Sequence, residues 1–414
     1  MKSCVVVGSG AREHALAWAI SKSATVTVTP GNDGIAAHGI TCVNTPATEL
    51  DADLFVIGPE QPLVEGLAEQ LRAQGKFVLG PNTDGAQLEG SKAFMKDFLR
   101  DAGVPTAAYG TFSEEEPAIS FLRTMVAPYV IKTDGLAAGK GVLVTSDFDE
   151  AVADIKDKLS GNAFGDAGTT VIIEEGLDGE ECSLIVLCDG SSTLALVPAQ
   201  DFKRVGDGGT GANTGGMGAY APMTEMRDDQ VREVMQNIIA PTVVELNKRG
   251  IDFRGVLYAG VMLTSKGPKL LEYNVRFGDP ETEVLAPLYE ERLYDVLLAT
   301  ARGELDGLEL APRGACVTVV LASHSYPQGS RKGDVISGLG DDGQLASAID
   351  GVTIFHAGSA RRDDGAFVTN GGRVLAVTAT GETLREAREK AYAATQHISF
   401  DGRVMRSDIA LAVI

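Results

Sequence analysis

The first ninety residues alternate short apolar runs with segments of helical periodicity, and this alternation limits the folds open to the N-terminal part of the chain. We expect strands at residues 3–7, 25–29, 54–57 and 77–79, with helices at residues 12–20 and 62–74. Strands separated by helices in this way predict parallel βαβ units. Residues 41–53 are too few for a full crossover helix, so we expect an irregular connection there.

The remainder of the chain needs further domains, because 414 residues exceed what one core can hold. Turn-rich stretches at residues 81–85 and 312–314 predict boundaries, which gives domains at 1–90, 91–312 and 313–414. Ser91 is expected to cap a helix that ends before Gly103. Further elements are expected as a helix at 230–249, a hairpin of 255–263 with 269–273, strands at 316–321 and 373–379, and a helix at 384–397. The glycine-dense stretch 203–218 lacks periodicity and is expected to be a mobile loop.

Charge and cysteine usage narrow the classes of partner. The formal charge of −21 argues against a non-specific nucleic-acid surface or an anionic membrane surface, because both require clustered Lys and Arg. No apolar run approaches the roughly 20 residues that span a bilayer, and the N-terminus does not resemble a signal peptide. The five cysteines have neither metal nor disulfide spacing, so we expect a cytoplasmic protein.

Two glycine-rich stretches follow predicted strands. Gly8-Ser9-Gly10-Ala11-Arg12-Glu13 is either an anion anchor at a helix N-terminus or only a tight turn, and Glu13 replaces the third glycine of a dinucleotide site. Residues 134–141, DGLAAGKG, depart from a P-loop but are suited to a flap over phosphates. Lys132 on the preceding strand is a candidate phosphate ligand, and the alternative is a solvated lysine at a strand end.

Acidic and amide side chains follow or occupy two later strands. Glu174 and Glu175 end an apolar strand, where they could serve an adenine and ribose site or lie on an ordinary surface. Glu272, Asn274 and Arg276 alternate along a strand and are expected to project from one face. Carboxylate and amide oxygens suit Mg²⁺, and an adjacent arginine can neutralise phosphoryl oxygens. The alternative is the wet face of an edge strand. The five histidines show no ligand spacing and are expected to be structural.

Several phrases together resemble one family, namely GSGAREHALAW, QLEGSKAFMKDFL, IKTDGLAAGKGV, QDFKRVGDGGTGANTGGMGAYAP and EYNVRFGDPETE. They are similar to the glycinamide ribonucleotide synthetases of the ATP-grasp superfamily over nearly the whole chain. The resemblance implies an α/β and α+β multidomain protein: a Rossmann-like N-terminal domain, a two-lobed ATP-grasp core whose smaller lobe covers about 107–176, and a small α+β C-terminal domain. It also implies ligation of glycine to 5-phosphoribosylamine with ATP as co-substrate, through glycyl phosphate, by a monomer that uses Mg²⁺ or Mn²⁺.

The resemblance further implies roles for individual residues. Arg276 and Lys132 are expected to be catalytic, and Glu272 and Asn274 to bind the metal. The expected ATP-binding residues are Lys92, Lys132, Gly139, Lys140, Gly141, Glu174, Glu175, Leu177 and Glu181. The expected substrate-binding residues are Gly10, Glu13, Glu60, Asp201, Lys203, Asp279 and Arg373, with Arg373 at the ribotide phosphate.

Three other functions are weighed against this one. A ribotide ligase of the same superfamily that uses formate or bicarbonate would share the nucleotide site and differ in its acceptor pocket. A dinucleotide-binding oxidoreductase is disfavoured by Glu13. A non-enzymatic nucleotide-binding regulator would not need Glu-x-Asn-x-Arg together with a flap.

Overall fold

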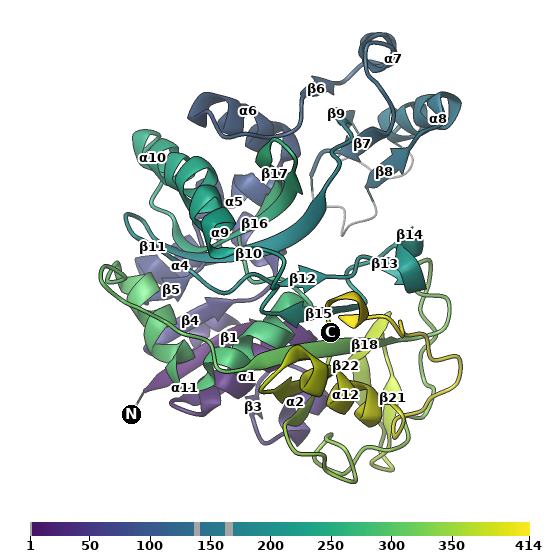
Figure 1. Ribbon diagram of the computed structural model, residues 1–414. Helices are drawn as coiled ribbons and strands as arrows, with labels where there is room; N and C mark the ends of the chain where they lie inside the picture. The colour runs from purple at the N-terminus through teal and green to yellow at the C-terminus, as the bar shows by residue number, and fades with distance from the viewer. Residues whose placement is uncertain (1, 136–140, 162–168) are drawn as a thin grey trace.

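The computed structural model describes residues 2–135, 141–161 and 169–414 (Figure 1). Its N-terminal part is a five-stranded parallel sheet in the order β3-β2-β1-β4-β5. The strands are β1 (Ser3–Gly8), β2 (Thr25–Pro30), β3 (Thr41–Cys42), β4 (Leu54–Ile57) and β5 (Val78–Leu79). All residues of β4 and nearly all of β1 are buried, as expected for strands covered by helices on both faces. The predicted parallel arrangement is confirmed.

The helices of this part are α1 (Ala11–Ser21), α2 (Asp33–Ala37), α3 (Glu60–Val64), α4 (Leu67–Ala73) and α5 (Thr83–Gly90). The single helix expected at 62–74 was wrong, because Gly66 adopts a left-handed conformation (φ 86°) and divides the segment into α3 and α4. The connection at 41–53 is irregular as predicted, with only β3 and a 3₁₀ turn at Ala47–Glu49.

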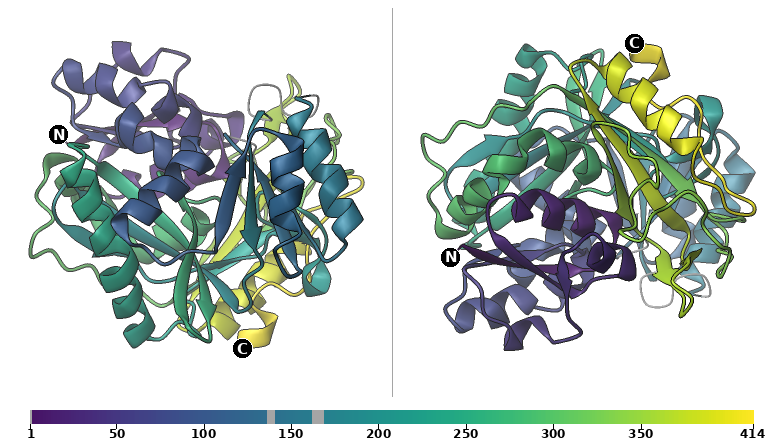
Figure 2. Two further views of the ribbon diagram at one scale, coloured as in Figure 1. Left: turned by 90° about the horizontal axis from the view of Figure 1, so that it is seen from above. Right: turned by 90° about the horizontal axis from the view of Figure 1, so that it is seen from below.

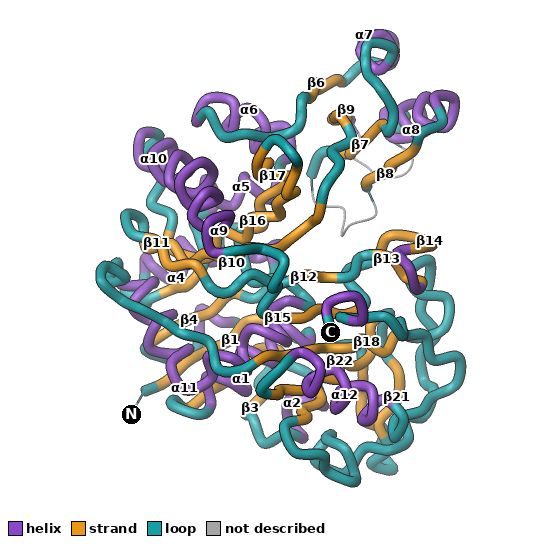
Figure 3. Tube along the Cα trace, in the orientation of Figure 1, coloured by secondary structure: helices purple, strands orange, loops and turns teal. Residues whose placement is uncertain are grey.

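A small lobe projects from the rest of the molecule at the upper right of Figures 1 and 3. It is an antiparallel sheet in the order β6-β9-β7-β8, made of β6 (Tyr109–Phe112), β9 (Val171–Glu175), β7 (Tyr129–Thr133) and β8 (Val142–Thr145). Helices α7 (Glu115–Leu122) and α8 (Phe148–Leu159) pack on it around Ile131, Ile155 and Ile173, which form a separate small core.

The larger lobe is a second antiparallel sheet, in the order β11-β10-β16-β17. Its strands are β10 (Glu180–Asp189), β11 (Thr193–Ala195), β16 (Arg254–Thr264) and β17 (Gly267–Asn274), so the predicted hairpin is confirmed. Helix α6 (Lys92–Ala102) begins where Ser91 accepts a hydrogen bond from the Phe94 amide, as predicted. The helix expected at 230–249 is α9 (Asp228–Val234) and α10 (Ala240–Lys248), joined by a π-helical turn at Met235–Ile239.

A third sheet joins strands from the middle and the end of the chain, in the order β12-β15-β18-β22-β19. They are β12 (Gln200–Asp201), β15 (Gly218–Ala221), β18 (Ala315–Ala322), β19 (Val352–His356) and β22 (Arg373–Gly381). Helix α12 (Leu384–Thr395) covers this sheet. Helix α11 (Glu281–Arg302) contacts both the same sheet and α1. Figure 2 shows the N-terminal and C-terminal sheets side by side, consistent with the contacts of α1 and α2 with β19. The C-terminal part also contains a short hairpin of β20 (Ser359–Arg361) and β21 (Phe367–Thr369) and a 3₁₀ turn at Leu411–Val413.

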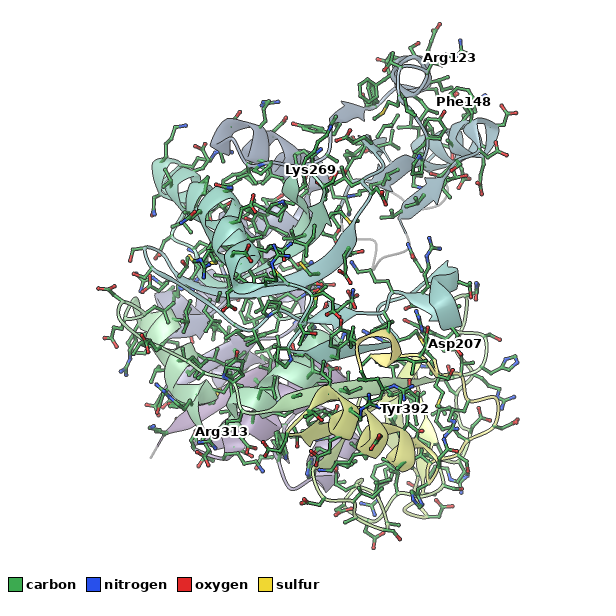
Figure 4. All side chains as sticks on the ribbon, viewed as in Figure 1. Arg123, Phe148, Asp207, Lys269, Arg313 and Tyr392 are labelled. Carbon is green, nitrogen blue, oxygen red and sulfur yellow. The ribbon has the colours of Figure 1, made fainter. Side chains whose placement is uncertain are left out.

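The glycine-dense stretch 203–218 was expected to be a mobile loop, which was wrong because part of it forms regular structure. It contains a hairpin of β13 (Arg204–Gly206) and β14 (Thr210–Asn213), turned by a 3₁₀ segment at Asp207–Gly209. The C-terminal end of the chain fixes this turn: Gly208 N donates to Asp408 Oδ2 (2.8 Å) and Ser407 N donates to Asp207 Oδ1 (2.8 Å). Figure 4 shows Asp207 above Tyr392 of α12.

Across the three described ranges, every helix is too short or too polar to be a candidate for crossing a bilayer.

Candidate active site

A buried carboxylate lies between two lysines where the small lobe meets the large one. Glu174, on β9, has its Oε1 2.9 Å from Lys132 Nζ on β7 and its Oε2 2.9 Å from Lys96 Nζ on α6. Burial acts to lower the pKa of Lys132, but the carboxylates of Glu174 and Glu272 outweigh it and raise the pKa. Lys132 is therefore a buried, charged group, which excludes the solvated strand-end lysine considered from the sequence.

The candidate metal ligands Glu272 and Asn274 are half-buried on β17, an edge strand. Burial acts to raise the pKa of Glu272, but the ammonium groups of Lys203, Lys132 and Lys92 lower it overall. None of the described residues donates a hydrogen bond to its carboxylate, although these three lysines and Arg276 act on it at longer range. Such a carboxylate fits a divalent cation.

The donor set fits a metal that shares its ligands with a nucleotide. The described segments contain no group of three His, Cys, Asp or Glu that could hold a metal ion. Glu272 and Asn274 supply two oxygen ligands, and Mg²⁺ is commonly held by one or two side chains with phosphates and water completing the shell. Mn²⁺ accepts the same oxygen ligands.

Arg276 lies just beyond β17 and joins this strand to the N-terminal part. Its Nη2 donates to Asn274 Oδ1 (3.1 Å) and lies 2.9 Å from Glu89 Oε1, while its Nε donates to Glu60 Oε2 (3.3 Å). Burial raises the pKa of Glu60, but Arg276 and Arg12 lower it below its usual value. The predicted common face of Glu272, Asn274 and Arg276 is thus partly realised, since Asn274 and Arg276 are in contact.

Lys203 lies near β17, the strand that carries the candidate metal ligands Glu272 and Asn274. It forms an ion pair with Glu181, and the pKa of Lys203 is raised because Asp201 and Glu181 outweigh its burial. Burial raises the pKa of Asp201, against the opposing effect of Lys203. Glu272 also contributes to the raised pKa of Lys203, so the two candidate substrate residues Asp201 and Lys203 adjoin the candidate metal site.

The candidate ribotide residues lie where the N-terminal and C-terminal sheets approach each other. Glu13 Oε2 accepts from Gly10 N (2.7 Å), and its other oxygen lies 2.6 Å from Arg12 Nε, so Glu13 closes the start of α1. Arg373 Nη1 lies 3.0 Å from Asp279 Oδ1 and donates to the Asp279 carbonyl (2.9 Å). Burial acts to raise the pKa of Asp279, but Arg373 and Arg12 lower it overall.

The predicted adenine hinge is divided between side chains that face in different directions. Glu175 pairs with Lys269 (2.8 Å), which Figure 4 labels, and accepts from the Ala108 amide (3.1 Å). Leu177 lies half-buried between β9 and β10. The carboxylates of Glu174 and Glu175 are thus both paired with lysines.

The flap residues are only partly described. Lys92 Nζ donates to the Gly135 carbonyl (2.9 Å), and Gly141 is buried, with its carbonyl accepting from Thr133 N (2.9 Å). Gly139 and Lys140 lie outside the described residues.

The sequence reasoning missed several groups that the fold brings to this region. Lys96 is the clearest, since it stands four residues after Lys92 on the same helix, a spacing that places both on one face. Glu281, the last residue of the segment FGDPE (residues 277–281), accepts from Tyr258 OH (2.5 Å) and Ser183 Oγ (3.0 Å) in a buried network. Glu283 is fully buried, and its carboxyl group adjoins that of Asp279.

Two antiparallel lobes that bring lysines against a strand bearing Glu-x-Asn define the class of ATP-grasp ligases. Family models for phosphoribosylglycinamide synthetase match residues 2–89 (N domain), 90–282 (ATP-grasp domain) and 316–412 (C domain). The chain belongs to the phosphoribosylglycinamide synthetase family.

Relatives of known structure or name support this assignment. The chain is 47% identical to the phosphoribosylamine–glycine ligase of Escherichia coli O157:H7, over 99% of this chain and 98% of that one. The crystal structure of the Thermotoga maritima phosphoribosylamine–glycine ligase is similar at a TM-score of 0.85 and 35% identity, covering 99% of this chain and 100% of that one. The biotin carboxylase domain of Hydrogenobacter thermophilus 2-oxoglutarate carboxylase, solved with MgADP, shares the fold at a TM-score of 0.72 and 15% identity, covering 98% of this chain and 91% of that one.

Proposed function

We propose that this chain joins the carboxyl group of glycine to the amine of 5-phosphoribosylamine, with conversion of ATP to ADP and phosphate, as a step of purine biosynthesis. The observation that carries the proposal is the opposition of Lys92, Lys132 and Lys203 to the Glu272 carboxylate, whose pKa all three lower. A metal-bound triphosphate requires cations beside its phosphates and a carboxylate beside its metal ion, and this arrangement supplies both.

The metal ligands of the proposal are Glu272 and Asn274, with Mg²⁺ or Mn²⁺ as the ion. When bound, the ion would neutralise charge on the phosphate oxygens and orient them for transfer. Glu272 and Asn274 hold oxygen atoms at the end of a rigid strand, and Arg276 holds the Asn274 amide through a 3.1 Å hydrogen bond. In this proposal Arg276 is a catalytic residue that lies beside the transferring group, where its charge stabilises the phosphoryl oxygens.

The nucleotide lies, in this proposal, between the two lobes. Lys92 and Lys132 bind its phosphates, and Gly139, Lys140 and Gly141 belong to the flap that covers them. Glu174, Glu175 and Leu177 define the adenine hinge, and Glu181 lies near the ribose. Glycine binds near Asp201 and Lys203, and its carboxylate attacks the γ-phosphoryl group to give glycyl phosphate and ADP.

In this proposal the ribotide binds on the side of β17 that faces away from the nucleotide. Gly10, Glu13, Glu60 and Asp279 surround the ribose and amine, and Arg373 is the candidate for the phosphate. The amine nitrogen attacks the acyl carbon of glycyl phosphate and phosphate leaves, so a new C–N bond forms and the amine loses one proton. Exclusion of water protects the acyl phosphate during this second step.

We further propose that the chain works as a monomer in the cytoplasm on small molecules alone. The charge of −21 disfavours nucleic acid and anionic membranes as partners.

Glycine-dependent release of ADP tests this function. The purified protein would be given ATP, Mg²⁺ and freshly prepared phosphoribosylamine, with glycine, formate or bicarbonate in parallel reactions. We expect ADP and glycinamide ribonucleotide only with glycine. Turnover with formate or bicarbonate and none with glycine would contradict the proposal and favour another ribotide ligase.

A further inference from the structure

We propose that Lys96 is a positioning residue of this ligase: its buried ammonium holds the Glu174 carboxylate, and through it Lys132, in the place from which Lys132 meets the ATP phosphates. This inference rests on the proposed nucleotide site, and it adds to that site a residue that never touches the ligand.

The geometry allows Lys96 only an indirect role. Its side chain is 0% exposed, while that of Lys132 retains 9%. Each oxygen of Glu174 faces one lysine at 2.9 Å, so the carboxylate bridges the two ammonium groups. Lys96 therefore acts on the nucleotide through Glu174 and Lys132.

Lys96 also connects the small lobe to the strand that carries the candidate metal ligands. Its Nζ donates to Thr106 Oγ1 (2.8 Å), and Thr106 Oγ1 donates to the Leu270 carbonyl on β17 (2.7 Å). Glu272 lies two residues further along that strand. One line of polar contacts thus runs from β17 through Lys96 to Glu174 on β9, which fixes the spacing between the two sides of the proposed site.

The charges of the group explain why a second lysine is needed. A single buried Glu174–Lys132 pair would be neutral, and the carboxylate would offset the charge that Lys132 offers to phosphates. Lys96 supplies a second positive charge, so Lys96, Glu174 and Lys132 together keep a net charge of about +1 at neutral pH. Loss of Lys96 would leave Glu174 paired with Lys132 only, and the group would lose its net positive charge.

The charge of Lys96 is sensitive to pH in an accessible range. Burial lowers the pKa of Lys96 to about 8 against the opposing effect of Glu174, whereas the pKa of Lys132 is raised. The charged or titratable groups that face Lys96 are Glu174 and Lys132 of the small lobe, Glu272 of β17, and Tyr109 of β6, whose ring centroid is 5.6 Å away. Above about pH 8, Lys96 is the first of the two lysines to become neutral.

Lys96→Met tests the proposal, because methionine retains the length of the side chain and removes its charge. The exposed Lys332→Met is the matched control, and the wild type establishes glycine-dependent turnover. We expect Lys96→Met to raise the Kd for ATP, measured by calorimetry, and the KM for ATP about tenfold, which is the loss typical of one hydrogen bond to a charged group. The KM for glycine should change less than twofold, and the loss of wild-type ATP affinity above about pH 8 should disappear.

A double-mutant cycle with Glu174→Gln separates positioning from a general loss of structure. If Lys96 acts through Glu174, Lys96→Met should weaken ATP binding less in the Glu174→Gln background than in the wild type. If Lys96→Met alone does not fold, Lys96→Met/Glu174→Met, which removes both charges, should fold and show the raised Kd.

An unchanged Kd for ATP in folded Lys96→Met, or equal losses for ATP and glycine, would overturn the inference. Because ATP binding by calorimetry needs neither glycine nor phosphoribosylamine, this result is distinguishable from failure of the ligase function in the wild type.

Discussion

Arg276 donates a hydrogen bond to the side-chain oxygen of Asn274, with Nη2 and Oδ1 3.1 Å apart. The same guanidinium pairs with Glu89 and Glu60 of the N-terminal part. The strand proposed to hold the metal is therefore tied to the sheet proposed to hold the ribotide, and one arginine lies between the two half-reactions.

Substitution of Arg276 should affect both catalysis and stability. We expect Arg276→Met to lower kcat about 100-fold, because it removes a charge beside the transferring phosphoryl group. It also leaves Glu89 without its ion-pair partner, at a cost of roughly 3 kcal/mol in the free energy of unfolding. Steady-state kinetics and urea unfolding measure the two effects. Arg276→Lys, which keeps the charge without the fork of donors, should recover part of the stability and little of kcat. Wild-type kcat in Arg276→Met would remove Arg276 from the mechanism.

Removal of the Glu272 carboxylate should abolish ligation and leave the fold intact. Glu272 is half-buried and accepts no hydrogen bond from the described residues, so Glu272→Ala removes no core side chain, although Lys203, Lys132 and Lys92 lose an opposing charge. We expect no glycine-dependent ADP release and an unchanged circular dichroism spectrum. Glu272→Gln is the isosteric control and should also be inactive. Near-normal turnover of Glu272→Ala at saturating Mg²⁺ would remove the metal assignment.

The buried carboxyl of Glu283 should make the wild type less stable as the pH rises. Burial and the neighbouring Asp279 raise the pKa of Glu283 well above its usual value. A carboxyl group with a raised folded-state pKa contributes stability below its unfolded pKa of about 4.5 and loses that contribution as the pH approaches the folded-state value. Glu283→Gln keeps the shape of the side chain and removes its ionisation. Between roughly pH 5 and 9, the range above the unfolded pKa, the free energy of unfolding of Glu283→Gln should therefore fall less than that of the wild type. Urea titration at each pH measures this difference. Identical pH slopes for the two proteins would show that Glu283 does not titrate in this way.

Two buried histidines, His14 and His356, and the half-buried His38 should make the contact between the N-terminal and C-terminal sheets sensitive to acid. His14 Nε2 lies 2.9 Å from His38 Nδ1, and His14 Nδ1 accepts from the His356 amide (2.9 Å). Burial lowers the pKa of all three, that of His356 to about 4. A base with a lowered folded-state pKa contributes stability above its unfolded pKa of 6.5 and loses it as the pH falls toward the folded-state value.

We therefore expect the free energy of unfolding to fall between pH 6.5 and about 4. His356→Gln should cost about 1–2 kcal/mol at pH 7, because it disturbs the bonds to Ser359 and the Gly343 carbonyl, and it should reduce the slope of stability in the acid range. Thermal melts at a series of pH values measure both. The exposed His397→Gln is the matched control and should leave the slope unchanged. A steep acid slope that persists in His356→Gln would assign it to other groups.

Much of the fold could be predicted from local sequence patterns. The parts that could not be predicted are those that depend on contacts between distant residues. The parallel sheet, the cap at Ser91 and the hairpin of β16 and β17 have signals within their own segments. The hairpin at 204–213 has none, because Asp408 and Ser407 fix it from the other end of the chain. The apolar periodicity of residues 62–74 likewise did not indicate that Gly66 would adopt a left-handed conformation and divide the helix.

The candidate site shows the same division. Lys132 could be singled out as a candidate because it lies on the strand before a glycine-rich segment, and Glu272 and Asn274 because they alternate along a strand. The pairing of Glu174 with Lys96 joins residues 78 positions apart, and the pairing of Arg373 with Asp279 joins residues 94 positions apart, so neither is visible in the sequence. The predicted domain boundaries and the individual roles of the site residues stay predictions, although β12 and β15, from the predicted middle domain, share a sheet with β18, β19 and β22.

The most direct test of the account is a crystal structure of the protein with Mg²⁺ and a non-hydrolysable ATP analogue. We expect the triphosphate between Lys132 and the Glu272–Asn274 end of β17, with the metal ion bound to oxygen atoms of Glu272 and Asn274. A triphosphate bound away from that strand, with Glu272 and Asn274 free of metal, would contradict it.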